Sequence, residues 1–192
     1  MKTSVKFARE HELVKLPTKG VEDAGYDLYV DPKWLNEQAD KAIIIYPNQT
    51  AMIPTGLRSV IKSSYYAQIQ ERGSTGVKGM KYGAGVIDSG FRSTWNVVIT
   101  NCDRKPIVIT TEENFNRLIA EGTKALQEAH PDDEITEEGV RGLYTFYSSA
   151  KGIAQFVLLP VPQVRIDEIT VEELMQFESE RMEGKLGSTN VE

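Results

Sequence analysis

Cysteine, histidine and long apolar runs are scarce in this chain. Cys102 is the only cysteine among 192 residues, so an internal disulfide is excluded and a Cys-based metal site is disfavoured. His11 and His130 lie far apart in the sequence and give zinc no evident set of ligands. No run approaches the roughly 18 consecutive apolar residues that a membrane helix needs. We therefore expect a protein without a membrane span, kept in a reducing compartment.

Positive charge in excess is also missing, because the formal net charge is −6. A protein that binds a nucleic-acid polymer needs many Lys and Arg side chains to neutralise phosphates, so that class of partner is not expected. Basic residues do gather locally, around Arg72, Lys78, Lys81 and Arg92 and again at Arg181 and Lys185. The net charge therefore does not exclude a small polyanion as a ligand. The first ten residues return to charged side chains before an apolar signal core forms, so we expect a cytoplasmic location.

The pattern of apolar residues predicts a mainly β fold. Short β-branched or aromatic runs, separated by Pro, Gly, Asn and Ser, are typical of strands in an all-β sandwich or barrel. The length is consistent with one domain. The predicted strands are 5–8, 24–30, 42–46, 51–57, 65–70, 95–100 and 156–160, and a last strand at Val164–Ile169 is expected to close the sheet.

Between residues 111 and 138 the pattern becomes helical. Thr111 is a good N-cap residue, two glutamates follow it, and Phe115, Leu118, Ile119 and Leu126 recur at helical spacing. These signals predict a helix over 112–129 and a second short turn near Thr136. A further helix is predicted over 170–178, and the polar, glycine-bearing end of the chain is expected to be mobile.

The stretch Gly85-Val-Ile-Asp-Ser-Gly-Phe-Arg92 is the most informative in the chain. In an extended strand Val86 and Asp88 share one face while Ile87 points to the other, so Ile87 can anchor the segment in the core while Asp88 faces a ligand. Phe91 then lies close to that carboxylate. The pattern is typical of a nucleotide pocket.

This stretch resembles the third motif of the dUTP pyrophosphatases, and four other segments resemble the remaining motifs in the right order. These are Ala24-Gly-Tyr-Asp-Leu-Tyr29, Glu71-Arg-Gly-Ser-Thr-Gly76, Ile153-Ala-Gln-Phe156 and Arg181-Met-Glu-Gly-Lys-Leu-Gly-Ser-Thr189. The resemblance runs from about residue 5 to 189, except for thirty to forty residues between 101 and 148. It implies a dUTPase-like β-barrel or jelly-roll, 1–192, with an inserted, mainly helical segment at 110–147 and a flexible C-terminal lid at 179–192.

The resemblance also implies a reaction and an assembly. The reaction is hydrolysis of dUTP to dUMP and pyrophosphate, with Mg²⁺ held mainly through the substrate phosphates rather than by direct protein ligands. The assembly is a homotrimer whose active sites combine motifs from neighbouring subunits. The inserted segment resembles the extra segments of some phage dUTPases, which suggests a phage or prophage origin and a protein partner bound through 110–147.

Each site residue takes its role from the same resemblance. Asp88 is the expected general base for the water that attacks the α-phosphate, Phe91 lies under the deoxyribose, and Asp27 supports the site. The Gly83–Val86 hairpin is expected to read uracil through its backbone. The remaining expected substrate contacts are Arg72, Gly73, Ser74, Gly85, Val86, Ile87, Gln155, Arg181, Gly187, Ser188 and Thr189.

Four positions depart from the family pattern. Glu71 replaces a proline, Gly73 stands where a serine is usual, Gly152 ends a turn that commonly reads Gly-Asp-Arg, and Leu186 replaces an aromatic residue that stacks on uracil. Two alternatives therefore stay open. One is a dCTP deaminase-like enzyme of the same fold, which needs a glutamate near Val98. The other is a catalytically weakened dUTPase scaffold that acts by binding another protein.

Overall fold

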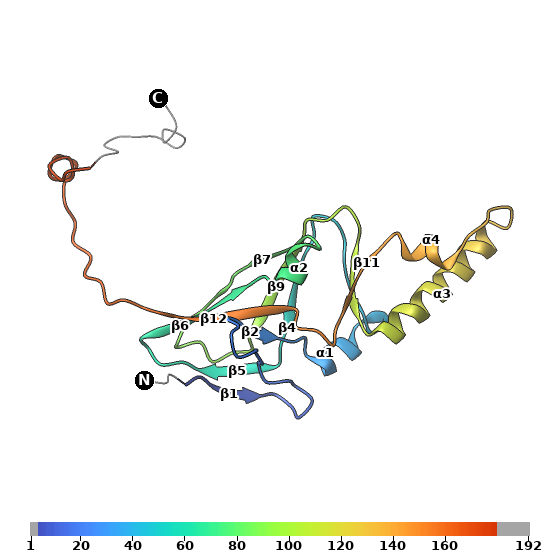
Figure 1. Ribbon diagram of the computed structural model, residues 1–192, viewed down its shortest axis with the longest axis horizontal. Coiled ribbons are helices and arrows are strands. Elements are labelled where there is room, and N and C mark those ends of the chain that lie inside the picture. Colours follow the sequence, from blue (N-terminus) through green and yellow to red (C-terminus); the bar gives the residue numbers. More distant parts are fainter. Residues whose placement is uncertain (1–3, 180–192) are drawn as a thin grey trace. The chain divides into compact units, whose positions relative to one another are not determined.

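The computed structural model describes residues 4–179. Residues up to Val161 form one compact unit, and those from Pro162 onward form a second. The first unit is mainly β, and many of its strands and helices are labelled in Figure 1. The described part of the second unit holds one short helix, α5 (Val171–Leu174). Within the described range, no helix is long and apolar enough to cross a membrane.

The described strands form four small sheets. The first pairs β1 (Lys6–Arg9) with β5 (Leu57–Val60), and the second orders β11 (Thr145–Ser148), β10 (Ile107–Thr110) and β3 (Ile43–Ile45). The third orders β2 (Tyr26–Leu28), β12 (Ala154–Pro160), β6 (Tyr65–Gln70) and β8 (Val86–Ile87). The fourth orders β4 (Thr50–Pro54), β9 (Asn96–Asn101) and β7 (Met80–Gly83).

The predicted strands are confirmed in most places, with two corrections. The run 51–57 is two strands, β4 and β5, because the chain turns at Gly56, whose φ is 68°. The expected strand Val164–Ile169 is wrong, since no described residue pairs with it and Val164 and Ile166 are 74% and 92% exposed. Its β-branched alternation fits a strand, but propensity without a pairing partner does not make one.

Local capping signals fix the helices. The predicted helix is confirmed as α3 (Glu112–Ala129), whose N-cap Thr111 accepts a hydrogen bond from the Asn114 backbone, and α4 (Glu137–Arg141) begins after the N-cap Thr136. The helix predicted over 170–178 is the shorter α5, and Phe177 is exposed. The other short helices are α1 (Pro32–Glu37), η1 (Ala39–Lys41) and α2 (Gly73–Gly76).

The predicted inserted segment packs against a sheet of the first unit. β10 and β11 pair in parallel, and parallel neighbours need a crossover connection, which here contains α3 and α4 (Figure 1). Phe115 and Ile119 of α3 are buried in a small second core with Val108 of β10. The last residues of the predicted 110–147 segment belong to β11.

Aromatic rings organise the main core of the first unit. Trp95 is fully buried and meets Phe7 and Phe156 edge-on at centroid distances of 5.2 Å. Each such side chain contributes roughly 2–3 kcal/mol when removed from water. Phe156 belongs to β12, so this core fixes the strand that carries Gln155.

Candidate active site

Asp27 and Gln155 are direct partners across the antiparallel pair of β2 and β12, and Tyr26 is the partner of Phe156. Because successive side chains of a strand point to opposite faces, Asp27 and Gln155 share one face while Tyr26 and Phe156 share the other. The rings of Tyr26 and Phe156 stack at 5.2 Å. The first and fourth motifs thus meet through the register of two strands.

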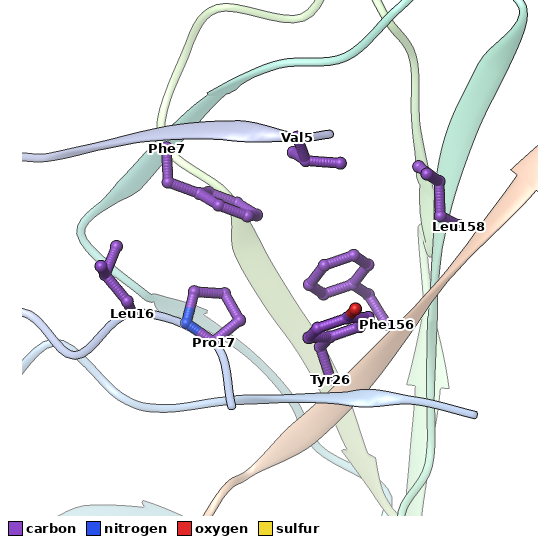
Figure 2. Close-up of a pocket in the computed structure, with 7 residues that line it drawn as sticks. All are labelled: Val5, Phe7, Leu16, Pro17, Tyr26, Phe156 and Leu158. Atoms are coloured by element: carbon purple, nitrogen blue, oxygen red, sulfur yellow. The ribbon is translucent and has the colours of Figure 1, made fainter. Parts of the chain in front are cut away.

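The Tyr26 face opens on a pocket of about 370 Å³. Figure 2 shows its lining residues, which are Val5, Phe7, Leu16, Pro17, Tyr26, Phe156 and Leu158. None of these side chains is charged. A triphosphate needs cationic or N–H donors, so this pocket is not the phosphate site, and the opposite face carries Asp27 and Gln155.

Arg72 lies on that opposite face and is held by several hydrogen bonds. Its Nε donates to Asp27 Oδ1 at 2.7 Å, and its Nη1 donates to Gly152 O at 3.1 Å, Tyr147 Oη at 3.2 Å and Ser74 Oγ at 3.3 Å. Burial lowers the pKa of the guanidinium, but the hydrogen bond with Tyr147 and the charge of Asp27 outweigh it and raise the pKa overall. Arg72 is therefore a fixed positive charge.

The second motif folds as the short helix α2. The hydroxyl of Thr75 is fully buried; it accepts from the Arg72 backbone N–H and donates to the Arg72 carbonyl, both at 3.0 Å. A Cβ on Gly73 would meet nothing within 4 Å, so that departure from the family pattern leaves open space rather than a clash. Ser74 is exposed and bonded to Arg72.

Gln155 joins the fourth motif to the second. Its Nε2 donates to the Glu71 carbonyl at 2.7 Å. A Cβ on Gly25 would lie 2.2 Å from Gln155 Oε1, so glycine at this position makes room for the amide. The Glu71 side chain is 3.6 Å from Lys81. Glu71 thus contacts Gln155 through its backbone, which any residue type can supply.

The turn before the fourth motif is anchored although it departs from the usual Gly-Asp-Arg. Gly152 is buried, and its carbonyl accepts from Arg72 Nη1 and, at 2.6 Å, from Tyr147 Oη. A Cβ on Gly152 would lie 2.9 Å from Asp27 Cγ. Thr75 and Tyr147 were not among the predicted site residues, and only the family pattern around Arg72 could have drawn attention to Thr75.

Asp88 lies in a second group, at the end of β8. Ile87 is 6% exposed and anchors the strand, as predicted, while Asp88 is exposed. The Asp88 carbonyl accepts from the Phe91 backbone N–H at 3.1 Å, and the Phe91 ring is 38% exposed. Arg92 Nη1 donates to the Ser89 carbonyl at 2.6 Å. One hydrogen-bonded turn therefore carries both an exposed carboxylate and an exposed ring.

The Gly83–Val86 segment is not the hairpin that the sequence predicts. β7 pairs with β9 whereas β8 pairs with β6, so the turn at Ala84 and Gly85 joins two different sheets. Ala84 has a φ of 49°. A Cβ on Gly85 would lie 2.6 Å from the Ile69 carbonyl oxygen, so close strand packing requires glycine there.

The Arg72 group and the Asp88 group lie towards opposite ends of β6. Ile87 pairs with Ala67, which puts Asp88 opposite Tyr66 near the start of the strand. Arg72 follows the other end, at Gln70. From Tyr66 to Gln70 an extended strand advances roughly 13 Å, at about 3.3 Å per residue. The structure thus brings Asp27, Arg72, Ser74 and Gln155 together, and Asp88 with Phe91, as two groups. Arg181, Gly187, Ser188 and Thr189, and the departure Leu186, lie outside the described residues.

Comparisons with known proteins identify the family of this chain. A dUTPase family model matches residues 12–150. The deoxyuridine 5′-triphosphate nucleotidohydrolase of Yarrowia lipolytica is 33% identical over 144 residues, covering 72% of this chain and 86% of that protein. The Pol polyprotein of caprine arthritis encephalitis virus is 33% identical over 137 residues, covering 71% of this chain but only 11% of the polyprotein.

The fold is that of a dUTPase as well. The structure of the Staphylococcus bacteriophage 80alpha dUTPase with dUPNHPP superposes with a TM-score of 0.66 and 20% identity, over 99% of this chain and 100% of that one. The predicted dUTPase-like, mainly β fold is therefore confirmed. The match of the family model over most of the chain, together with the Yarrowia relative, shows that this chain belongs to the dUTPase family.

Proposed function

We propose that this protein hydrolyses dUTP to dUMP and pyrophosphate, with Asp88 as the general base. Membership of the dUTPase family supports the reaction. The observation that carries the role of Asp88 is its exposed carboxylate, on a hydrogen-bonded turn that also carries the exposed Phe91 ring. The carboxylate accepts a proton from water as the water oxygen attacks the α-phosphorus, and the bond to pyrophosphate breaks.

The Arg72 group supplies the phosphate contacts in this proposal. Nη2 of Arg72 has no hydrogen-bond partner within residues 4–179 and is available to a phosphate oxygen. Ser74 adds an exposed hydroxyl, and the Gln155 amide is held next to the second motif by its hydrogen bond to the Glu71 carbonyl. Hydrogen-bond donors that are already fixed around the phosphate stabilise the negative charge of the transition state, and they lower the activation barrier because the protein need not rearrange. The polar tail, with Arg181 and Gly187 to Thr189, is proposed to close over the triphosphate.

Magnesium is proposed to enter with the substrate. Within residues 4–179 no group of three His, Cys, Asp or Glu side chains could hold a metal ion. Magnesium commonly keeps its waters and binds through substrate phosphates, and such binding needs no cluster of protein carboxylates. When bound, the ion would neutralise charge on the phosphate oxygens.

A homotrimer is proposed because the two groups lie apart in one chain. The separation of Asp88 and Arg72 along β6 favours a site in which the Asp88 group of one copy faces the Arg72 group of another. Sedimentation of the full chain tests the trimer. Mixing Asp88→Asn with Arg72→Ala subunits tests the shared site, because complementing halves restore activity only if one site uses two copies.

Discrimination against ribonucleotides is proposed to depend on Phe91. A ring packed under the deoxyribose leaves no room for a 2′-hydroxyl, and the Phe91 ring is sufficiently exposed to meet a sugar. The variant Phe91→Ala should lower the preference for dUTP over UTP by about 10-fold, which corresponds to about 1.4 kcal/mol. An unchanged ratio of kcat/KM values would remove this role.

One experiment separates the proposed reaction from its alternatives. The full chain is incubated with Mg²⁺ and dUTP, dCTP, dTTP or UTP, and pyrophosphate and ammonia are measured. Pyrophosphate from dUTP supports the proposal, ammonia from dCTP supports a deaminase, and neither product supports a binding scaffold. The deaminase is disfavoured because Val98, in β9 opposite Gly83, cannot act as an acid or base.

A protein partner is proposed for the helical segment on account of its charge. Residues 111–144 hold nine acidic and three basic residues, so they carry as much net negative charge as the whole chain. Between α3, α4 and the sheet lies an apolar pocket of about 390 Å³, bordered by the exposed Leu126 and Leu143. Apolar anchors in an acidic segment complement a basic amphipathic helix, which is the partner that we propose.

The partner proposal has a direct test. A Lys/Leu amphipathic peptide of about 18 residues should bind the full chain more weakly as salt rises, whereas a Glu/Leu peptide should not bind. Reversing the charges of Glu137 and Glu138 should weaken binding of the Lys/Leu peptide. Replacing 112–144 with a flexible linker keeps β10 and β11 and should abolish that binding. Equal binding by all these forms would contradict the proposal.

A further inference from the structure

Phe146 and Tyr147 are neighbours in β11, and they serve different parts of the molecule. Successive residues of a strand point to opposite faces. The Phe146 ring stacks on Phe115 of α3, with centroids 4.6 Å apart and planes at 15°. Tyr147 is only 2% exposed and directs its hydroxyl to Gly152 and Arg72. The strand β11 therefore connects the helical segment with the Arg72 group.

The Tyr147 hydroxyl both donates and accepts a hydrogen bond. It donates to the Gly152 carbonyl at 2.6 Å and accepts from Arg72 Nη1 at 3.2 Å. Buried polar groups need such partners, and the partners of a deleted group are left unpaired at a cost. The same Gly152 carbonyl accepts from Arg72 Nη1, so the hydroxyl, the carbonyl and the guanidinium form a closed triangle.

We propose that Tyr147 is a positioning residue for the reaction proposed above, which its hydroxyl serves by holding the Arg72 guanidinium in one orientation. With Nε fixed on Asp27 and Nη1 fixed on Tyr147 and Gly152, Nη2 stays free for a phosphate oxygen. The inference rests on the proposed function, and it assigns to β11 a part in the Arg72 group, which is otherwise built from β2, β12 and the start of α2.

Two further observations support this role. The hydrogen bond that Arg72 Nη1 donates to Tyr147 Oη helps to raise the pKa of Arg72 against the effect of burial. The turn at 150–152 reads Ala-Lys-Gly, so it lacks the aspartate and the arginine of the Gly-Asp-Arg that is common in the family. In their place, Tyr147 ties the turn to the second motif.

The test compares Tyr147→Phe with Tyr144→Phe. Both changes delete only a hydroxyl, and the Tyr144 hydroxyl makes no hydrogen bond to the described residues, while its ring packs in the second core. We expect Tyr147→Phe to lower kcat/KM for dUTP by about 10-fold, mainly through kcat, at a temperature where all forms are folded. Tyr144→Phe should stay within about 2-fold of the parent.

A second background shows whether Tyr147 acts through Arg72. In Arg72→Lys protein the guanidinium is absent, so adding Tyr147→Phe should change kcat/KM by less than about 2-fold. A lower melting temperature with unchanged kcat and KM would overturn the proposal, because it marks a merely structural hydroxyl. An equal loss in both backgrounds would overturn it too.

Failure of the proposed function is recognised separately. If the parent forms no pyrophosphate from dUTP, the reaction is wrong, and the contact is then judged from NMR exchange of the Arg72 Nη1 protons, which face Tyr147. Exchange about 10-fold faster in Tyr147→Phe than in the parent supports a guanidinium held by the hydroxyl. Equal exchange rates in the two proteins overturn the inference.

Discussion

Arg72 Nε lies 2.7 Å from Asp27 Oδ1, so the second motif is fixed to the first by a charge-assisted hydrogen bond. The two side chains are 27% and 25% exposed. Water screens a pair at this depth only in part, and pairs nearer the surface contribute about 0–1 kcal/mol. We therefore assign to this ion pair an orienting role first and a stabilising role second.

The variant Asp27→Asn should impair activity more than stability. It keeps one acceptor oxygen but removes the charge that orients Arg72, so kcat/KM should fall about 10-fold. The free energy of unfolding should fall by about 1 kcal/mol. Glu121→Gln is the matched control, because it breaks the exposed pair with Arg117 in α3 and should leave kcat/KM unchanged. Unaltered kinetics in Asp27→Asn would show that Arg72 needs no such anchor.

Two glycines on either side of Asp88 should respond differently to substitution. A Cβ at Gly85 would lie 2.6 Å from both the Ile69 carbonyl and Gln68 Nε2, while a Cβ at Gly90 would meet nothing within 4 Å. Gly85→Ala should lower the free energy of unfolding by about 1–3 kcal/mol, whereas Gly90→Ala should stay within about 0.5 kcal/mol of the parent. Urea denaturation of both variants measures the difference, and similar losses would refute the close packing at Gly85.

Glu10 gives the first unit a pH-dependent contact. The hydrogen bond that its carboxylate accepts from Thr94 lowers the pKa of Glu10, against the opposing effect of burial and with help from Arg58. A lowered folded pKa contributes stability that is present above the ordinary value of 4.5 and is lost as pH falls through the folded value.

Replacing Glu10 with Gln should therefore destabilise the protein at neutral pH and not in acid. Because the side chain is 33% exposed, screening limits the expected loss to about 0.5 kcal/mol at pH 7. Melting curves of parent and variant should converge as the pH falls below the ordinary pKa of a glutamate. A constant difference at every pH would mean that the charge of Glu10 plays no part.

Sequence reasoning succeeded where the signal is local. The helix α3 has its cap at Thr111 and its buried face at Phe115 and Ile119, all within a few turns of one another. The side chains of Ile87 and Asp88 were placed correctly by strand alternation alone. The order of the five motifs identified the family, which neither composition nor periodicity does.

It failed where partners distant in sequence decide the outcome. Tyr147 was assigned to an inserted segment, but pairing of β11 with β10 carries it to Arg72, far away in the chain. The turn at Gly85 looks like a hairpin, yet its two strands pair with different neighbours. Val164–Ile169 has the alternation of a strand without a partner among the described residues.

The most direct test of the proposed chemistry is the rate of pyrophosphate release from dUTP by Asp88→Asn, with Asp132→Asn as the control. Asp132 is an exposed carboxylate in the loop after α3, so its variant should match the parent. Loss of a general base should lower kcat by at least about 100-fold with little change in the melting temperature. If Asp88→Asn releases pyrophosphate as fast as the parent, Asp88 is not the base.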